Sequence, residues 1–241
     1  DQTLDFVVTD ADGDTDEATV TVNISKPEAP TFTGTVSVDE EGLADGTNPD
    51  APSETATWTA PDGYTIVSVS DGKLGTVVKT GDTTLDYTLS DAITHPAGSG
   101  ENTATGADSF EVTIMDGNGN TYTVKVDVDV TDDVPTISAD SLSKDVASGA
   151  EVTGRVDIDY GADNEGGQKS LTVNGQKGTA AEDGKLSFDL ENGTLVFDPA
   201  TGGYVFTADA NVTTDQTLDF VVTDADGDTD EVTVTVNISK P

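Results

Sequence analysis

Residues 215–241 read DQTLDFVVTDADGDTDEVTVTVNISKP, and residues 1–27 repeat the same 27 residues with one change, Ala18 in place of Val232. The two copies begin at positions 1 and 215, which lie 214 residues apart. A near-identical repeat of this length indicates a duplicated tandem array. The first copy starts within the motif, so we expect residues 1–27 to be the closing hairpin of a preceding repeat, cut from its body.

Apolar and polar side chains alternate in the quoted stretch on both sides of an Asp-Gly turn, a pattern that favours a β-hairpin. We predict that the inward-facing side chains are Leu218, Phe220 and Val222 on the first strand and Val232, Val234, Val236 and Ile238 on the second.

A weaker copy of the hairpin lies halfway along the chain. Residues 110–130 read FEVTIMDGNGNTYTVKVDVDV and align with residues 218–238, 108 positions further on. The array unit is therefore a pair of unlike domains, which we place at 28–134 and 135–241.

Other short runs also alternate, and Gly, Asp, Asn and Pro separate them. The runs are Thr31–Val38, Tyr64–Ser70, Leu85–Leu89, Val152–Ile158, Leu186–Leu190, Thr194–Phe197 and Tyr204–Thr207. No stretch sustains a helical apolar period, so we expect essentially no helix. About seven short strands per domain predict an all-β fold of two tandem immunoglobulin-like, cadherin-like β-sandwiches, placed end to end after the N-terminal hairpin.

Charge narrows the possible partners. The chain has 47 acidic and 10 basic residues, a net charge of -37. Such a surface repels nucleic-acid phosphates and anionic lipid, so we expect neither nucleic acid nor membrane as a partner. There is no Cys, so disulfides cannot stabilise the fold. Bound cations relieve the repulsion, and carboxylates are the hard oxygen ligands that Ca²⁺ prefers.

The hairpin turn is a candidate Ca²⁺ site. Asp224, Asp226 and Asp228 alternate around it, and their charges repel unless a cation lies among them. The run resembles the start of an EF-hand loop, but the twelfth position is Thr235 rather than Glu, and the flanks are strands. The alternative is a solvated turn in which Asp and Gly are favoured for backbone reasons.

Topology predicts further ligands. In a seven-strand sandwich the tip of the last hairpin points back to the linker through which the chain enters, here residues 131–135 with Asp132 and Asp133. The first connection of the preceding domain, with Glu40 and Glu41, should lie at the same junction, as should Asp91. Together these residues and the tip could supply the six to eight oxygens of a Ca²⁺ site.

The other type of junction is poorer in carboxylates. Its linker reads SKPEAP at residues 25–30, and the facing tip has Asp116, Asn118 and Asn120. We therefore predict an array that alternates a calcium-clamped joint with a proline-stiffened joint.

Several motifs resemble repeats of giant RTX adhesins of Gram-negative bacteria. They are VSVDEEGLADG at 36–46, YTLSDAITHPAGSGEN at 87–102, the DADGDT turns and the DDVP linker; residues 139–180 match only loosely. The resemblance implies extender domains on the outside of the cell, exported by type I secretion, stiffened by Ca²⁺ and holding a distal binding domain away from the surface. Biofilm formation and surface colonisation follow from that role. We expect a monomer whose partners are neighbouring repeats.

No catalytic constellation is evident, and we expect no enzyme. His95, the single histidine, lies in a Pro/Gly-rich loop where we predict an exposed side chain, and no G-x-S-x-G motif is present. Trp58 is predicted to pack in the core. The alternative function is a carbohydrate-binding module on the same fold, which would require an aromatic platform or a deep pocket.

Overall fold

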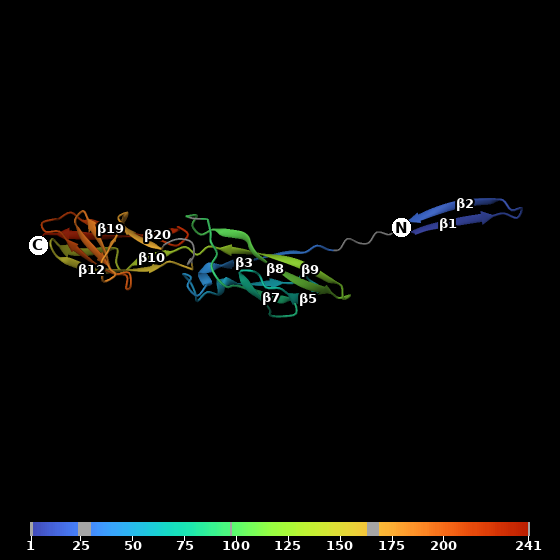
Figure 1. The fold of residues 1–241 in the computed structure, drawn as a ribbon, viewed down its shortest axis with the longest axis horizontal. Helices are drawn as coiled ribbons and strands as arrows, with labels where there is room; N and C mark the ends of the chain where they lie inside the picture. The colour runs from blue at the N-terminus through green and yellow to red at the C-terminus, as the bar shows by residue number, and fades with distance from the viewer. Residues whose placement is uncertain (1, 24–29, 97, 163–168, 241) are drawn as a thin grey trace. The chain divides into compact units, whose positions relative to one another are not determined.

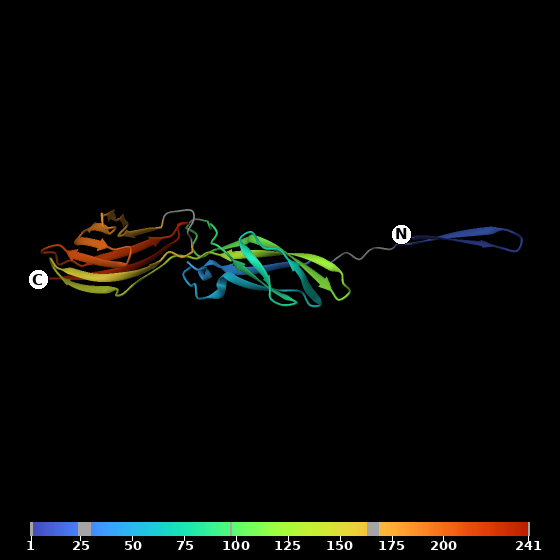
Figure 2. The same ribbon diagram turned by 60° about the horizontal axis from the view of Figure 1, so that its bottom comes forward.

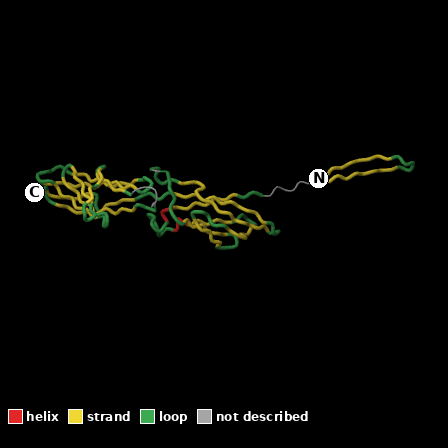
Figure 3. The backbone as a smooth tube through the Cα atoms, viewed as in Figure 1, coloured by secondary structure: helices red, strands yellow, loops and turns green. Residues whose placement is uncertain are grey.

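The computed structural model describes residues 2–23, 30–96, 98–162 and 169–240 (Figure 1). Across this part of the chain the structure is all-β, and its only helical elements are two 3-10 turns, η1 (Glu40–Gly42) and η2 (Pro52–Glu54). Figure 3 shows how strands dominate the backbone. The chain divides into two compact units, Asp1–Phe32 and Thr33–Pro241.

The first unit is a hairpin of β1 (Gln2–Thr9) and β2 (Thr15–Val22), paired antiparallel. Every side chain of the two strands is exposed, and Phe6 and Val8 are 53% and 70% exposed. The hairpin thus forms with its apolar face uncovered.

The second unit begins with a sandwich of two sheets. One sheet has the order β3-β9-β8-β5, and its strands are β3 (Thr33–Asp39), β9 (Thr121–Thr131), β8 (Thr103–Asp116) and β5 (Tyr64–Val69). The other has the order β4-β7-β6, with β4 (Thr55–Thr59), β7 (Thr84–Leu89) and β6 (Gly75–Lys79). The first strand, β3, pairs parallel with the last, β9.

An aromatic stack and a buried hydrogen bond connect the two sheets in the core of this first sandwich. Tyr87 of one sheet and Phe110 of the other stack with ring centroids 5.7 Å apart. The Tyr87 hydroxyl donates a hydrogen bond to Asp108 at 2.9 Å. Asp108 is only 5% exposed, and it also accepts backbone N–H bonds from Lys73, Leu74 and Ser109. A buried carboxylate therefore ties the loop before β6 to both sheets.

The second sandwich contains the quoted hairpin. One sheet has the order β11-β20-β19-β13-β14, with β11 (Ser143–Ala147), β20 (Thr229–Ser239), β19 (Gln216–Thr223), β13 (Ser170–Val173) and β14 (Gln176–Lys177). The other has the order β10-β12-β18-β17-β16-β15, with β10 (Thr136–Ala139), β12 (Glu151–Asp159), β18 (Gly203–Ala208), β17 (Gly193–Phe197), β16 (Leu186–Leu190) and β15 (Thr179–Ala180). Figure 2 shows the strands of this sandwich in two layers.

The predicted alternation and fold class are confirmed. Leu218, Phe220 and Val222 are fully buried in the core between the sheets, and the predicted face of β20 packs on the same core. Trp58 is 8% exposed, as expected for a core side chain.

The domain boundaries at 28–134 and 135–241 stay a prediction. Sheets occupy residues 33–131 and 136–239, but both sandwiches belong to the single compact unit Thr33–Pro241. In the described residues no helix is long and apolar enough to cross a membrane.

Candidate metal centre

The linker between the sandwiches carries two buried carboxylates. β9 ends at Thr131 and β10 begins at Thr136, so the linker is short. Asp132 and Asp133 are only 2% and 3% exposed. Buried carboxylates are costly unless hydrogen bonds or a cation compensate them, and the two residues differ in which compensation they have.

Asp133 is compensated by hydrogen bonds. Its Oδ2 accepts the backbone N–H of Thr47 from the first sandwich and that of Ala162 from the second, each at 2.9 Å. The Thr47 hydroxyl donates to Oδ1. Asp133 thus holds the linker to both sandwiches and belongs to none of the possible metal-ligand groups in the described residues. Its prediction as a metal ligand stays untested, and its observed contacts are structural.

The tip of the β19–β20 hairpin lies against the first sandwich. Asp224 Oδ1 accepts the backbone N–H groups of Gly227 and Asp228 at 2.9 and 2.8 Å, which shapes the turn. Asp228 Oδ1 in turn accepts the N–H of Gly100 at 2.6 Å. Because Gly100 belongs to the loop between β7 and β8 of the first sandwich, this bond joins the two sandwiches beside the linker.

Three aspartates converge here, as the topology predicted. Carboxylate oxygens of Asp132, Asp226 and Asp228 lie within 4.8 Å of one another. Asp224, Asp226 and Asp228 are 2%, 7% and 3% exposed. Among the described residues, no hydrogen bond reaches Asp224 Oδ2, either oxygen of Asp226, or Asp228 Oδ2. Buried acceptors that lack donors and share negative charge fit a cation.

The N-terminal hairpin carries the same turn with exposed side chains. Asp10, Asp12 and Asp14 repeat the tip sequence and also cluster within 4.8 Å, but all three are exposed. There the Asp12 side chain and the N–H of Asp14 hold the pKa of Asp10 below its usual range. Burial, followed by the carboxyl of Asp226, instead raises the pKa of Asp224 to about 6. Burial at the junction, rather than turn sequence, therefore distinguishes the candidate site.

A pH dependence follows for the calcium-free protein. Because the folded-state pKa of Asp224 is raised, to about 6 from 3.8, its protonation stabilises the fold below pH about 4, and this contribution is lost as pH rises through about 6. In chelator we expect the free energy of unfolding to fall by on the order of 2 kcal/mol between pH 4 and 7 from this group. Urea titrations of wild type and Asp224→Asn measure it, and equal slopes against pH for both proteins would contradict it.

A second cluster of buried side chains shares Asp132 with the cluster of Asp132, Asp226 and Asp228. Atoms of Glu40, His95 and Asp132 lie within 4.8 Å of one another, and Glu40 and His95 are 0% and 4% exposed. Glu40 Oε1 accepts the N–H of Ile93 at 2.7 Å. Burial raises the pKa of Glu40 above its usual range.

The prediction that His95 is exposed is therefore wrong. The bond from Ile93 draws the loop over Glu40 and encloses the imidazole. No periodicity in the loop sequence signals this, because a tertiary contact creates it. Of the other predicted ligands, Glu41 is half-buried and Asp91 is exposed, and neither lies in a possible metal-ligand group among the described residues.

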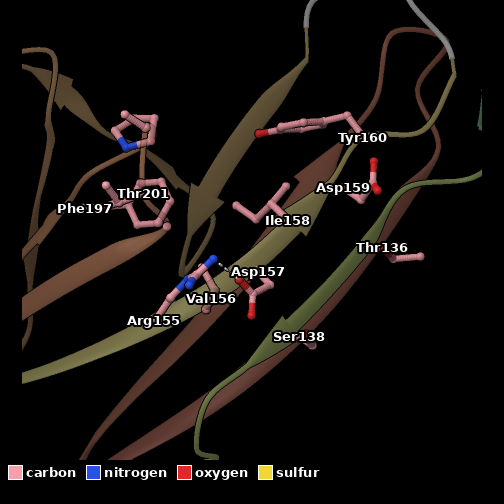
Figure 4. Close-up of a pocket in the computed structure, with 13 residues that line it drawn as sticks. Thr136, Ser138, Arg155, Val156, Asp157, Ile158, Asp159, Tyr160, Phe197 and Thr201 are labelled. Atoms are coloured by element: carbon pink, nitrogen blue, oxygen red, sulfur yellow. Dashed lines mark ion pairs between the residues drawn. The ribbon is translucent and has the colours of Figure 1, made fainter. Parts of the chain in front are cut away.

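A hollow of about 660 Å³ opens on the second sandwich. Figure 4 shows its lining from β10 and β12, with Tyr160 at one end. Arg155 and Asp157 form an ion pair at 2.5 Å in which both side chains are 61% exposed. The lining includes the aromatic residues Tyr160 and Phe197, of which Phe197 is buried in the core.

Part of the chain matches a known protein family. Residues 132–237 match the family model described as Bacterial Ig domain. No curated protein matches the chain. Among solved structures, domains 4 and 5 of the S-layer protein SbsC are 18% identical, with 76% of this chain and 79% of that chain covered and a TM-score of 0.29.

Two further solved structures come from animal proteins. The human Desmocollin-1 ectodomain is 14% identical over 98% of this chain and 48% of its own, with a TM-score of 0.31. The N-terminal Ig1-2 module of the Drosophila receptor protein tyrosine phosphatase DLAR is 12% identical over 86% and 95%, with a TM-score of 0.27. The family match covers less than half of the chain, residues 132–237, and these residues include most of the second sandwich.

Proposed function

We propose that the chain is a Ca²⁺-stabilised extender segment of a large bacterial cell-surface adhesin. One observation carries the proposal: Asp132 of the linker and Asp226 and Asp228 of the next sandwich converge, buried, within 4.8 Å. Ca²⁺ is favoured over Mg²⁺ because Ca²⁺ accepts six to eight oxygens in irregular geometry, whereas Mg²⁺ demands a near-ideal octahedron and retains water.

The same ion would act on the joint between the sandwiches. Without it, the buried carboxylates of the linker and the tip repel each other, and the second sandwich moves against the first. With it, Asp132, Asp226 and Asp228 bind a shared ion, which crosslinks the linker to the tip. The hydrogen bonds of Asp133 to Thr47 and Ala162 need no metal, so the linker keeps part of its order in both states.

A duplicated hairpin, a bacterial Ig-like repeat and a net charge of -37 support a tandem array outside the cell. In this proposal the array is exported by type I secretion, as in the RTX adhesins that the sequence resembles, and it projects a distal domain for attachment and biofilm formation at a Gram-negative cell surface. The segment itself acts as a monomer between neighbouring repeats.

Distance distributions across the joint test the proposal. The chain has no cysteine, so Val78→Cys and Glu151→Cys place one spin label on an exposed position of each sandwich. We expect a narrow distribution of label distances with Ca²⁺ and a broad one with chelator. Adding Asp226→Asn should abolish the narrowing, whereas Asp12→Asn should leave it. Equal widths with and without Ca²⁺ would overturn the proposal.

The hollow on the second sandwich favours a second candidate function, carbohydrate binding. Its volume, about 660 Å³, falls in the range of small-molecule sites, and Tyr160 offers one aromatic ring at its end. A glycan array probed with the chain in calcium buffer decides between the extender segment and the carbohydrate-binding module. Binding to a glycan that Tyr160→Ala abolishes would support the binding module.

A further inference from the structure

We propose that Glu40, His95 and Asp132 form a second metal site, for a transition-metal ion of the Zn²⁺ class, next to the calcium site. The two sites differ in their ligands: this site includes the imidazole nitrogen of His95, whereas the calcium site has only carboxylate oxygens. Ca²⁺ takes oxygen ligands, whereas imidazole suits Zn²⁺, Cu²⁺ and Ni²⁺. This site does not depend on the proposed extender function, although the two sites share Asp132.

Asn102 determines which nitrogen of His95 is free to bind. The Asn102 amide NH₂ donates to two oxygens that only accept, Gly100 O and Asp132 Oδ2, each at 2.9 Å. The amide oxygen of Asn102 must then be the atom that faces His95 Nδ1, at 3.2 Å. Because this oxygen cannot donate, Nδ1 carries the proton, and in a neutral imidazole Nε2 presents its lone pair.

That lone pair faces another acceptor. His95 Nε2 lies 3.4 Å from Glu40 Oε1, and both side chains are fully buried. Among the described residues, neither His95 Nε2 nor Glu40 Oε2 has a hydrogen-bond partner. Two buried acceptors in opposition need a positive charge between them.

The distance favours a metal ion over a proton. An imidazolium–carboxylate hydrogen bond is about 2.7–2.9 Å long, shorter than the 3.4 Å separation of His95 Nε2 and Glu40 Oε1. Two tetrahedral ligands on Zn²⁺, at bond lengths of about 2.0–2.2 Å, lie roughly 3.3–3.5 Å apart. Asp132 supplies the third protein ligand, within 4.8 Å of the other two ligand atoms.

The surroundings match known metal-bound histidines. Such a histidine usually donates its other N–H to a carbonyl or carboxylate, which fixes the ring and raises its basicity. Asn102 has this relation to His95. It also bonds Asp132, so one amide orients two of the three ligands.

The first test uses the wild-type chain, in which His95 is the only histidine. The full chain is labelled with ¹⁵N-histidine, held in saturating Ca²⁺, and titrated with Zn²⁺. We expect the free imidazole signals to be replaced by one equivalent of Zn²⁺, with the larger shift at Nε2. Imidazole signals that stay unchanged at one equivalent overturn the site, because Zn²⁺ on exposed aspartates does not reach the ring.

The second test uses a variant. We expect His95→Gln to weaken Zn²⁺ binding, measured by calorimetry in saturating Ca²⁺, by at least ~100-fold. The matched control, Asp12→Asn, should bind Zn²⁺ as wild type does. Unchanged affinity in His95→Gln overturns the proposal; if that variant does not fold, the wild-type titration decides. If Zn²⁺ binds but Ca²⁺ does not stiffen the joint, the extender function is contradicted and this site is supported. If Ca²⁺ stiffens the joint but Zn²⁺ does not bind, the extender function is supported and this site is contradicted.

Discussion

Replacing Asp226 by Asn is expected to abolish most of the calcium-dependent rise in melting temperature. An ion that binds only the folded state at a concentration 100 times its Kd adds ~2.7 kcal/mol of stability. For a unit of this size that corresponds to about 5–10 °C. Asp226 has both oxygens buried and free of hydrogen bonds among the described residues, so its neutralisation removes ligand charge without breaking a structural contact. Scanning calorimetry with Ca²⁺ and with chelator measures the difference.

The chain supplies its own control for this experiment. Asp12→Asn makes the same substitution in the same turn sequence, but at the exposed copy. It should leave the calcium response of the Thr33–Pro241 unit unchanged. In chelator the sign reverses: Asp226→Asn should melt above wild type, because it removes one of several buried like charges. A full calcium response in Asp226→Asn would place the ion elsewhere.

Asp108→Ala is expected to destabilise the first sandwich by at least ~3 kcal/mol. The substitution leaves the N–H groups of Lys73, Leu74 and Ser109 and the hydroxyl of Tyr87 without their shared acceptor. Each buried donor that loses its partner costs about 1–3 kcal/mol. Urea unfolding in saturating Ca²⁺ measures the loss, so that the metal sites contribute equally to both proteins.

The pH profile provides a second signature of Asp108. Burial acts to raise its pKa, but the N–H groups of Lys73, Leu74 and Ser109 and the Tyr87 hydroxyl together hold the pKa below the usual value of 3.8. The stabilisation is therefore present above pH 3.8 and lost as pH falls through the folded-state pKa. Asp82→Ala, at a side chain 94% exposed, is the control and should change stability by less than about 0.5 kcal/mol. If Asp108→Ala lowers the free energy of unfolding no more than Asp82→Ala does, the hydrogen bonds to Asp108 do not stabilise the first sandwich.

Periodicity made the sheets and their inward faces predictable. Leu218, Phe220 and Val222 alternate with polar residues, and the structure buries them. The convergence of Asp132 with Asp226 was predictable too, because sandwich topology brings the last turn back to the entry linker. Both inferences use features common to sandwiches of this kind: the alternation of side chains along a strand, and the position of the last hairpin turn beside the entry linker.

The chemistry at the junction was less predictable, for a physical reason. Glu40 and Glu41 are neighbours, and the 3-10 turn decides that Glu40 is buried while Glu41 is only half-buried. Asp132 and Asp133 are neighbours in sequence, yet backbone N–H groups from both sandwiches bond Asp133, whereas Asp132 bonds the Asn102 amide and lies in a carboxylate cluster. The position of His95 depends on a loop without periodicity.

The parallel pairing of β3 with β9 has a mechanical consequence. Thr33–Asp39 lies in register with Lys125–Thr131, and Ser143–Ala147 pairs with Thr235–Ser239 in the same parallel sense. When tension pulls the entry of a sandwich away from its exit, these strands are drawn past each other along their length. Their hydrogen bonds are then sheared together instead of being unzipped one at a time. Each sandwich should resist pulling force most strongly along the direction in which its parallel pair of strands runs, β3 with β9 in the first and β11 with β20 in the second.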